Sequence, residues 1–420
     1  MTSASGHNVS DNEHVQEAFQ QAMANLQRGN LPVAESLLRP LTHLAPERSN
    51  VWQLLGVVRA QQGDMDEAET LLQRAIELAP DSAGAHHNLG NVLALMLRNT
   101  DAVQALSRSL ELDPENPSAL VTRGQVYMAL GRPVDALNSL DAALVLDPTS
   151  SPALIARADA MRPLSDLGLV TREAAVAAYQ VALEAGADPD NVRYCLAAMG
   201  EAEAPDSAPA QFVTALFDTY AEAFDQHLLE TLAYRTPMQI GEALQHVDQG
   251  TVDQVLDLGC GTGLCGPLLR PLARQLTGLD LSPKMLDKAR ERGFYDDLVC
   301  AEMLGHLQAC LPASLDLVVA ADVFVYVGDL QPVFAAVAQA LQPAGRFVFS
   351  IETLDASRPN EAAVTTGYLL RHTRRYAHDR RHLEALGAAL ALQTEHTQEV
   401  VLRKDADKDV AGAVMVLRRT

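Results

Sequence analysis

A 34-residue period in the first half of this chain most constrains how it can fold. Small residues return where two helices must approach closely, and Pro returns where a helix must end because proline lacks a backbone N–H. The repeated positions are Trp52, Leu55, Gly56, Ala68, Leu72, Ala75 and Pro80; His86, Leu89, Gly90, Ala102, Leu106, Ser109 and Pro114; Leu120, Arg123, Gly124, Ala136, Leu140, Ala143 and Pro148; and, more weakly, Ala18, Gln21, Ala22, Ala34, Leu38, Leu41 and Pro46. The period therefore predicts helix pairs that stack into one array.

This pattern resembles the tetratricopeptide repeat (TPR). We predict a flexible leader at residues 1–14 and then an all-α TPR solenoid over residues 15–200, with about five repeats and a capping helix at residues 191–199. The resemblance implies a protein or peptide partner in the groove formed by the first helix of each repeat. Polar candidates on those helices are Asn50, Gln53, Arg59, His87, Asn88, Asn91, Arg123, Gln125 and Tyr127; most of them are equally compatible with a solvated face.

The second half of the chain has a different pattern. An Ala-, Pro- and acid-rich stretch at residues 201–210 has no apolar periodicity and predicts a linker. Strand-like apolar runs then alternate with helical segments over residues 211–420, which predicts an α/β, doubly wound (Rossmann-like) parallel sheet. Residues 392–401 and 410–418 predict a β-hairpin that closes the domain. The fold class expected is therefore multidomain.

The strongest site signal is the segment 255–266, where Gly259, Gly261 and Gly263 follow an apolar strand. Glycine is needed where φ is positive or where a ligand contacts the backbone. We expect a helix from there to about residue 276, with its free N–H groups directed at the ligand. Position 264 is Leu, so the third glycine of a dinucleotide motif is absent, and Asp257 would repel a pyrophosphate. The segment therefore favours a cationic, amino-acid-like cofactor.

Acidic residues follow the next two predicted strands. Asp280 lies 23 residues after Asp257, at the tip of the second strand, where a carboxylate can bind both hydroxyls of a ribose. Met285 comes early in the following helix, where an adenine face could rest. Glu302 ends the third strand. The ligand expected at this edge of the sheet is thus a nucleoside with a cationic extension.

Residues 211–420 resemble the class I S-adenosylmethionine (SAM)-dependent methyltransferases. The resemblance rests on the motif D-x-G-x-G-x-G, followed by an acid after the second predicted strand and another after the third. The whole chain is similar to bacterial TPR-repeat methyltransferases, through the segments 217–225, 321–330 and 375–378. The resemblance implies SAM as the cofactor and methyl transfer as the activity.

The resemblance also implies site roles. Asp257 would lie near the amino-acid end of SAM, Asp280 would bind the ribose, and Glu302 would accept the adenine amino group, although Asp is commoner at that position. The full set of implied cofactor-binding residues is Asp257, Gly259, Cys260, Gly261, Gly263, Asp280, Leu281, Met285, Glu302, Met303 and Ala321, with Tyr220 and Arg235 as further contacts.

Candidates for catalysis are less specific. A general base would help if the acceptor is a hydroxyl or an ammonium. The candidates are Asp322, Tyr326, Tyr376 and His378, which have structural alternatives as a turn cap, packing tyrosines and a surface residue. Arg235 and Arg375 could meet a substrate or cofactor carboxylate. Aromatic residues at 217, 220 and 224 share a helix face, which suits either core packing or a lid over the cofactor.

Bulk composition excludes several function classes. The formal net charge of −22 argues against a nucleic-acid partner. Five cysteines without paired spacing predict free thiols, a reducing cytoplasmic setting and no metal site. The N-terminus has no signal-peptide pattern and no window is apolar enough for a membrane span.

The sequence leaves three functions open. We favour a SAM-dependent methyltransferase whose TPR array recruits a protein partner or substrate. One alternative is a TPR interaction scaffold whose second domain is inactive or only senses SAM. The other is a small-molecule methyltransferase whose repeats mediate assembly.

Overall fold

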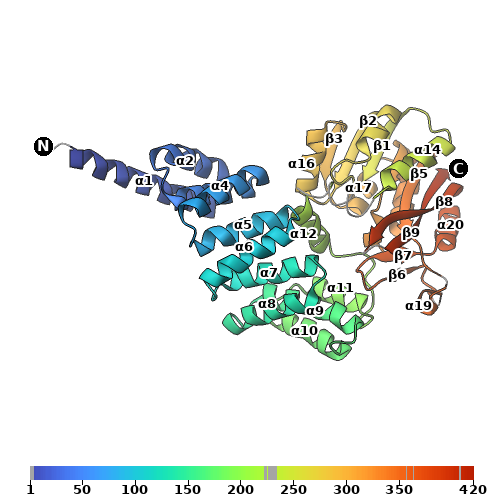
Figure 1. The fold of residues 1–420 in the computed structure, drawn as a ribbon. Helices are drawn as coiled ribbons and strands as arrows, with labels where there is room; N and C mark the ends of the chain where they lie inside the picture. The colour runs from blue at the N-terminus through green and yellow to red at the C-terminus, as the bar shows by residue number, and fades with distance from the viewer. Residues whose placement is uncertain (1–3, 222–224, 226–233, 356, 363, 406–407) are drawn as a thin grey trace. The chain divides into compact units, whose positions relative to one another are not determined.

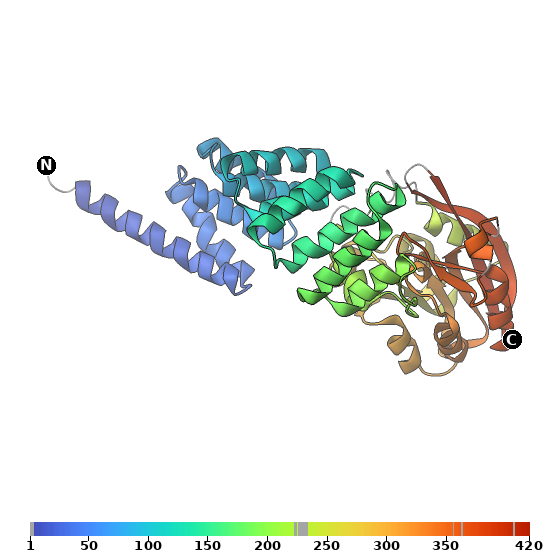
Figure 2. The same cartoon turned by 90° about the horizontal axis from the view of Figure 1, so that it is seen from below.

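The computed structural model describes residues 4–221, 225, 234–355, 357–362, 364–405 and 408–420. The chain forms two compact units, Met1–Ala187 and Asp188–Thr420 (Figure 1). The first unit consists of successive helix pairs, and Figure 2 shows the same pairs from below. Its helices are α1 (Ala4–Gln27), α2 (Leu31–Leu44), α3 (Ser49–Gln61), α4 (Met65–Leu78), α5 (Ala83–Leu95), α6 (Asn99–Leu112), α7 (Pro117–Ala129), α8 (Pro133–Leu146), α9 (Ser151–Asp166) and α10 (Arg172–Glu184).

The repeated small residue has a clear packing role in this unit. A Cβ added to Gly56, Gly90 or Gly124 would lie 2.8, 2.5 or 2.6 Å from the Cγ of Leu72, Leu106 or Leu140, respectively. Each glycine therefore lets one helix of a pair rest directly on a leucine of the other. This contact recurs every 34 residues and confirms the predicted repeat.

The ends of the repeat region differ from the sequence-based boundaries. α1 begins at Ala4, so most of the segment expected as a flexible leader is helical; residues 5–27 contain no proline that would break it. Helix α11 (Pro189–Ala198), expected as the cap of the solenoid, falls in the second compact unit. The hydroxyl of Tyr194 on α11 donates a 2.5 Å hydrogen bond to the carbonyl oxygen of Arg374, far along the chain in that unit.

The second unit is built on a seven-stranded sheet with the order β3-β2-β1-β4-β5-β9-β8. The strands β3, β2, β1, β4 and β5 are parallel, and the order reverses between β1 and β4, where doubly wound folds bind ligands. The last two strands form the predicted antiparallel hairpin. The bounds are β1 (Val252–Leu258), β2 (Ala273–Asp280), β3 (Asp297–Cys300), β4 (Leu315–Ala320), β5 (Leu341–Glu352), β8 (Leu392–Asp405) and β9 (Lys408–Arg419), and a separate two-stranded sheet joins β6 (Tyr368–Leu370) to β7 (Tyr376–His378).

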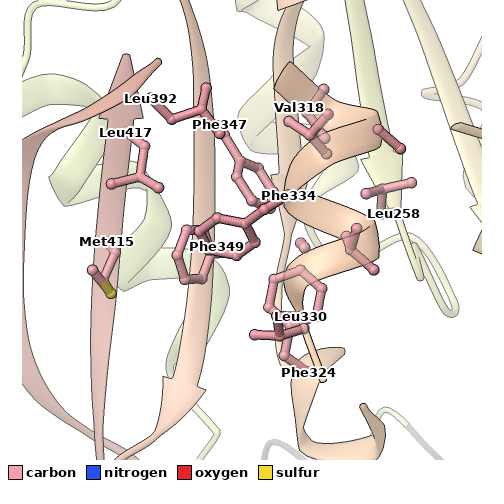
Figure 3. Close-up of a cluster of buried hydrophobic side chains, with 14 of the residues drawn as sticks. Leu258, Val318, Phe324, Leu330, Phe334, Phe347, Phe349, Leu392, Met415 and Leu417 are labelled. Carbon is pink, nitrogen blue, oxygen red and sulfur yellow. The ribbon is translucent and has the colours of Figure 1, made fainter. Parts of the chain in front are cut away.

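Helices cover both faces of this sheet. Phe347 and Phe349 on β5 point to one face and pack with Phe334 of α18, whereas Val348 between them packs in the cluster on the other face, as the period of two requires (Figure 3). The helices are α12 (Ala210–Tyr220), α14 (Thr236–His246), α15 (Gly266–Leu269), α16 (Pro283–Arg292), α17 (Met303–Ala309), α18 (Gln331–Ala340), α19 (Pro359–Ala362) and α20 (Arg380–Ala389), with short 3-10 turns η2 (Arg270–Leu272) and η3 (Phe324–Tyr326).

The prediction of one helix from the glycine turn to about residue 276 was wrong. α15 ends at Leu269, and β2 already begins at Ala273. Pro271 explains the early end, because it cannot donate a backbone hydrogen bond one turn back. Within the described part of the chain, no helix is both long and apolar enough to cross a bilayer.

Candidate functional site

The glycine turn after β1 takes a left-handed backbone at three alternate positions. The φ angles of Gly259, Gly261 and Gly263 are 63°, 54° and 85°. At Gly259 the space is also closed, since an added Cβ would lie 2.5 Å from Cγ2 of Val323. Side chains are thus excluded from this turn by conformation and by contact, as the sequence predicted. At these three glycines the turn therefore presents backbone atoms and no side chain.

A cavity of about 350 Å³ lies at this turn. It collects residues from the carboxyl ends of the parallel strands and from segments before β1. Eleven of the predicted site residues line it: Asp257, Gly259, Cys260, Gly261, Asp280, Leu281, Glu302, Met303, Ala321, Asp322 and Tyr326. The ends of four strands far apart in sequence therefore meet at one cavity, as the parallel topology requires.

Asp257 and Asp280 form the acidic end of the cavity together with Glu302. Asp257 is 1% exposed, and its Oδ2 accepts a 2.7 Å hydrogen bond from the hydroxyl of Tyr295. Burial raises the pKa of Asp257 to about 7; the Tyr295 bond opposes that rise and the nearby Asp280 adds to it. A cation placed beside this buried carboxyl would stabilise its ionised form.

Asp280 ties the second strand to the glycine turn. Its Oδ2 accepts from the N–H of Gly261 at 2.9 Å, and its Oδ1 accepts from the N–H of Ser282 at 2.9 Å. Burial raises the pKa of Asp280, and these backbone bonds counteract the rise. Its carboxylate therefore holds the turn in place while it faces the cavity. Glu302 similarly caps α17, since its two carboxylate oxygens accept from the N–H groups of Leu304 and Gly305 at 3.0 and 2.7 Å.

The other predicted site residues do not line the cavity. Met285 is packed in the core at 1% exposure, and Gly263 faces Tyr295 and Ala289. Arg235 is exposed, with its backbone N–H donating to the carbonyl of Leu402. The side chain of Tyr220 and the whole of Phe224 lie outside the described residues.

Two catalytic candidates have structural hydrogen bonds. Tyr376 is buried, and its hydroxyl donates to the carbonyl of Pro205 at 2.5 Å. His378, predicted on the surface in its structural alternative, is buried instead, with Nε2 at 2.9 Å from the carbonyl of Val327 and 3.2 Å from that of Gly328. Burial lowers the pKa of His378 to about 4. The imidazole is therefore neutral near pH 7 and donates Nε2–H to these carbonyls.

Asp322 and Tyr326 are the catalytic candidates that line the cavity. Asp322 follows β4 with a φ of 59°, uncommon for a residue other than glycine, and its N–H donates to Oγ of Ser350 at 2.7 Å. Its carboxylate pairs with Arg403 at 3.2 Å. Tyr326 is a neutral phenol, since burial raises its pKa.

Arg403 was missed by the sequence analysis. It lies on β8, its side chain is 2% exposed, and it pairs with both Asp322 and the buried Glu352 at the end of β5. The predicted strand ended at residue 401, whereas β8 extends to Asp405, so no sequence signal pointed to Arg403. Arg375 lines the cavity as well. Of the two arginines predicted as possible partners of a ligand carboxylate, Arg375 therefore lies at the site and Arg235 does not.

The segment expected as a linker is a wall of the cavity. Ser207, Ala208 and Ala210 line it. The N–H of Ala208 donates to the carbonyl of Tyr326 at 2.8 Å, and the carbonyl of Asp206 accepts from the N–H of Gly328 at 2.7 Å. Residues 206–208 are thus hydrogen-bonded to the loop after η3. Ala202, Ala204 and Ala208 of the predicted linker belong to one hydrophobic cluster with Tyr326.

Two further acids, both in the helical segment before β1, accept hydrogen bonds from the glycine turn and from the start of α16. Ser282 donates to Asp218 at 2.5 Å, and Thr262 donates to Asp225 at 2.5 Å. Phe217 beside Asp218 lines the cavity and also packs edge-on against Tyr326 in a hydrophobic cluster, so core packing and a lid both stay predictions for this helix face. These acids lie in the segment 217–225 that carried the narrower resemblance, but the sequence assigned them no role.

The residues present fit SAM. The turn has room for a ligand against its backbone, and the acidic end suits a cationic nucleoside. Asp280 would hold the ribose, Asp257 the amino-acid end, and Glu302 with Met303 the adenine. When bound, SAM supplies a methyl group already activated by its sulfonium.

Comparison with known proteins identifies a methyltransferase domain and tetratricopeptide repeats in this chain. A family model described as a methyltransferase domain matches residues 256–349, and two tetratricopeptide-repeat models match residues 47–115 and 98–160. The chain is 35% identical over 120 residues to the ubiquinone biosynthesis O-methyltransferase of Idiomarina loihiensis, covering 27% of this chain and 48% of that protein. It therefore spans about half the length of that relative.

Two further relatives extend the match. The malonyl-[acyl-carrier protein] O-methyltransferase of Serratia marcescens is 31% identical over 150 residues, covering 35% of this chain and 55% of that protein. The ubiquinone biosynthesis O-methyltransferase of Thiobacillus denitrificans is 31% identical over 185 residues, covering 40% of this chain and 78% of that protein. The repeat models show that the same polypeptide carries tetratricopeptide repeats. The alignment with the Thiobacillus protein, together with the glycine turn and the acids that line its cavity, shows that the chain belongs to the SAM-dependent methyltransferases.

Proposed function

We propose that the chain transfers the methyl group of SAM to an oxygen atom of an acceptor, and that the TPR array recruits the protein that is, or that carries, this acceptor. The observation that carries the proposal is one cavity with two chemically different ends. The acidic end suits SAM, whereas Val213, Phe217, Tyr326 and Val327 contribute apolar and aromatic surface for a second molecule.

Oxygen as the accepting atom is supported by the names of the relatives, which are O-methyltransferases acting in ubiquinone biosynthesis or on malonyl-[acyl-carrier protein]. Holding donor and acceptor in line supplies much of the rate of such a transfer. The chain contributes two walls for this purpose: the strand ends on the donor side, and the segment 207–217 on the acceptor side.

Recruitment by the repeats is supported by their regularity. The glycine–leucine contact between paired helices recurs every 34 residues, and stacked repeats of this kind form extended concave surfaces that bind partners. A scaffold with an inert second domain would not need the closed glycine turn or a buried carboxyl beside it, whereas a SAM-sensing scaffold would, so methyl transfer is what separates a sensor from an enzyme. An acceptor presented by a protein would instead use both halves of the chain.

The test combines SAM binding with methyl transfer. Methyl-labelled SAM is incubated with a cell extract and the full-length protein, and the extract is then separated into protein and small-molecule pools. We expect label in the protein pool with wild type, and we expect Asp280→Asn to weaken SAM binding by about tenfold or more, because Asp280 faces the donor. Asp297→Asn is the matched control, since Asp297 is exposed at the start of β3.

The outcomes separate the three functions. SAM binding without transfer to either pool would support the scaffold. Label confined to small molecules would support the small-molecule methyltransferase. A groove variant, Asn88→Ala with Gln125→Ala, should reduce labelling of the protein pool without changing SAM binding; equal labelling would argue against recruitment by the repeats.

A further inference from the structure

The two ends of the cavity carry opposite charge. Asp257, Asp280 and Glu302 belong to the acidic end, at the carboxyl ends of β1, β2 and β3. Arg375 and Arg403 form what we call the arginine end; Arg375 lies between β6 and β7, and Arg403 lies on β8 at the opposite edge of the sheet. A cationic donor is therefore favoured on one side and an anion on the other.

Arg403 is fixed by its own ion pairs. It lies between Asp322, at 3.2 Å, and Glu352, which is 3% exposed. Glu352 is also bound by Arg371 at 3.0 Å, and Arg371 in turn binds Glu361 at 2.8 Å. Asp322 and Glu352 are thus both paired with the buried Arg403, and Glu352 is also paired with Arg371, whose side chain is 14% exposed. Asp322 faces the cavity as half of an ion pair and repels an incoming anion less than a lone carboxylate would.

Arg375 is the arginine that is still available to a ligand. Its contact with Glu352 is 3.9 Å long, longer than the other two ion pairs of that carboxylate. Its side chain is 27% exposed, and it lines the cavity. A planar guanidinium binds carboxylates through paired hydrogen bonds. Arg375 can therefore direct its N–H donors to an anion in the cavity while Arg403 and Arg371 keep their ion pairs with Glu352.

The arginine end also offers few groups for removing a proton. Asp322 is the carboxylate of this end that lines the cavity, and Arg403 donates to both of its oxygens, at 3.2 and 3.4 Å. Among the described residues that line the cavity there is no histidine or lysine. Tyr234 and Tyr326 are buried phenols with raised pKa values, so they are neutral near pH 7. His378 directs Nε2 to the carbonyls of Val327 and Gly328. A hydroxyl or ammonium acceptor has to lose a proton, whereas a carboxylate is already ionised at this pH.

We propose that the methyl-accepting group is a carboxylate bound by Arg375, so that the product is a methyl ester. This inference rests on the proposed methyl transfer at the same cavity. One carboxylate oxygen forms the new bond to the methyl carbon, and the methyl–sulfur bond breaks with its electron pair passing to sulfur. No proton moves, and the other carboxylate oxygen stays with Arg375. Phe217 and Val213 provide an apolar surface for the rest of the acceptor.

The first test is the stability of the product to alkali. Methyl-labelled SAM and extract are incubated with the full-length protein, and the labelled material is treated with mild alkali in a sealed vessel. Methyl esters release labelled methanol under these conditions, whereas methyl ethers and methylamines keep their label. We expect the label to become volatile. Alkali-stable label would overturn the carboxylate assignment but leave methyl transfer standing, and bound SAM without any transfer would overturn both.

The second test separates acceptor binding from donor binding at Arg375. We expect Arg375→Gln to raise the half-saturating amount of the acceptor fraction by about tenfold or more, with the dissociation constant of SAM unchanged. Arg375→Lys should recover part of the loss because it restores the charge. Arg381→Gln, an exposed position on α20, is the matched control. If Arg375→Gln weakens SAM binding instead, Arg375 binds the donor carboxylate and the assignment fails.

Discussion

The hydroxyl of Tyr295 donates a 2.7 Å hydrogen bond to Oδ2 of Asp257, and this bond joins the loop before β3 to the buried end of β1. Burial holds the pKa of Asp257 at about 7, and the Tyr295 bond keeps it from rising further. A carboxyl in this position can change its charge when a cationic ligand arrives. Proton release and SAM binding are therefore expected to be linked.

The first prediction concerns the pH dependence of SAM binding. Only ionised Asp257 attracts the cationic donor, so affinity should fall as pH drops below about 7, by up to about tenfold per pH unit. Titration calorimetry at pH 6, 7 and 8 measures it, and repeating the titration in buffers of different ionisation enthalpy counts the protons released. A SAM affinity that is flat from pH 6 to 8 would contradict the role of Asp257.

The second prediction concerns the Tyr295 hydroxyl. Tyr295→Phe removes a bond that favours the ionised carboxylate, so the pKa of Asp257 rises and less of it is ionised at pH 7. SAM binding at pH 7 should weaken by about fivefold to tenfold and recover at pH 8.5, since one pKa unit corresponds to a tenfold change in ionisation. A loss that persists equally at pH 8.5 would indicate a packing defect rather than a shifted pKa.

The same group affects the stability of the unliganded protein. Asp257 has a folded-state pKa of about 7, whereas the ordinary pKa of this group is 3.8. Because the folded chain holds this proton more tightly, the group contributes stability at low pH that is lost as pH rises through about 7. Asp257→Asn should therefore flatten the decline in the free energy of unfolding between pH 5 and 8. Chemical denaturation of both proteins at several pH values measures the difference.

The third prediction concerns the glycine turn. Gly259→Ala introduces a Cβ 2.5 Å from Val323 at a φ of 63°, so it should abolish SAM binding and cost about 1–3 kcal/mol of stability. Gly293 is the matched control, because it also has a positive φ of 71° but no atom within 4 Å of the added Cβ. Gly293→Ala should cost about 1 kcal/mol and leave SAM binding intact. Equal SAM binding by the two variants would sink the proposed role of the turn.

The fourth prediction concerns Arg403. Arg403→Met leaves Asp322 and Glu352 without their shared cation, which should cost about 3–5 kcal/mol of unfolding free energy at neutral pH. Burial already raises the pKa of Glu352, and losing Arg403 raises it further, so protonation at low pH should relieve part of the cost. Denaturation at pH 5 and pH 8 should show the larger loss at pH 8.

Arg274→Met is a suitable control for this experiment. Arg274 pairs with Asp253 at the surface, and its side chain is 78% exposed. A change within about 0.5 kcal/mol is expected there, since exposed ion pairs contribute little. A similar small change for Arg403→Met would mean that its ion pairs do not support the arginine end.

The fifth prediction concerns Tyr376. Its hydroxyl is committed to the carbonyl of Pro205, so Tyr376→Phe should cost about 1 kcal/mol of stability. Methyl transfer should stay within about threefold of wild type, whereas removing a general base lowers rates by about 100-fold or more. A rate loss of that larger size, with SAM binding unchanged, would restore Tyr376 as a catalytic residue.

The sequence alone determined the repeats, the parallel sheet and the acidic end of the cavity. These features are local or periodic: Gly56 and Leu72 lie within one helix pair, and Asp257 and Asp280 each end a strand whose apolar pattern gives its position. Parallel strands place their carboxyl ends at one edge of the sheet, so the sequence alone could predict that the residues at these strand ends lie together.

Only the tertiary structure determined the arginine end and the cavity wall formed by residues 207–217. Arg403 and Asp322 are separated by 81 residues, and the pair forms because β8 returns to the sheet beside β9. Residues 206–208 carry no pattern that distinguishes a linker from a packed segment, because their bonds to the loop after η3 use backbone atoms. Contacts made by the backbone, or by charges on distant strands, leave no period in the sequence, and the arginine end and this wall depend on such contacts.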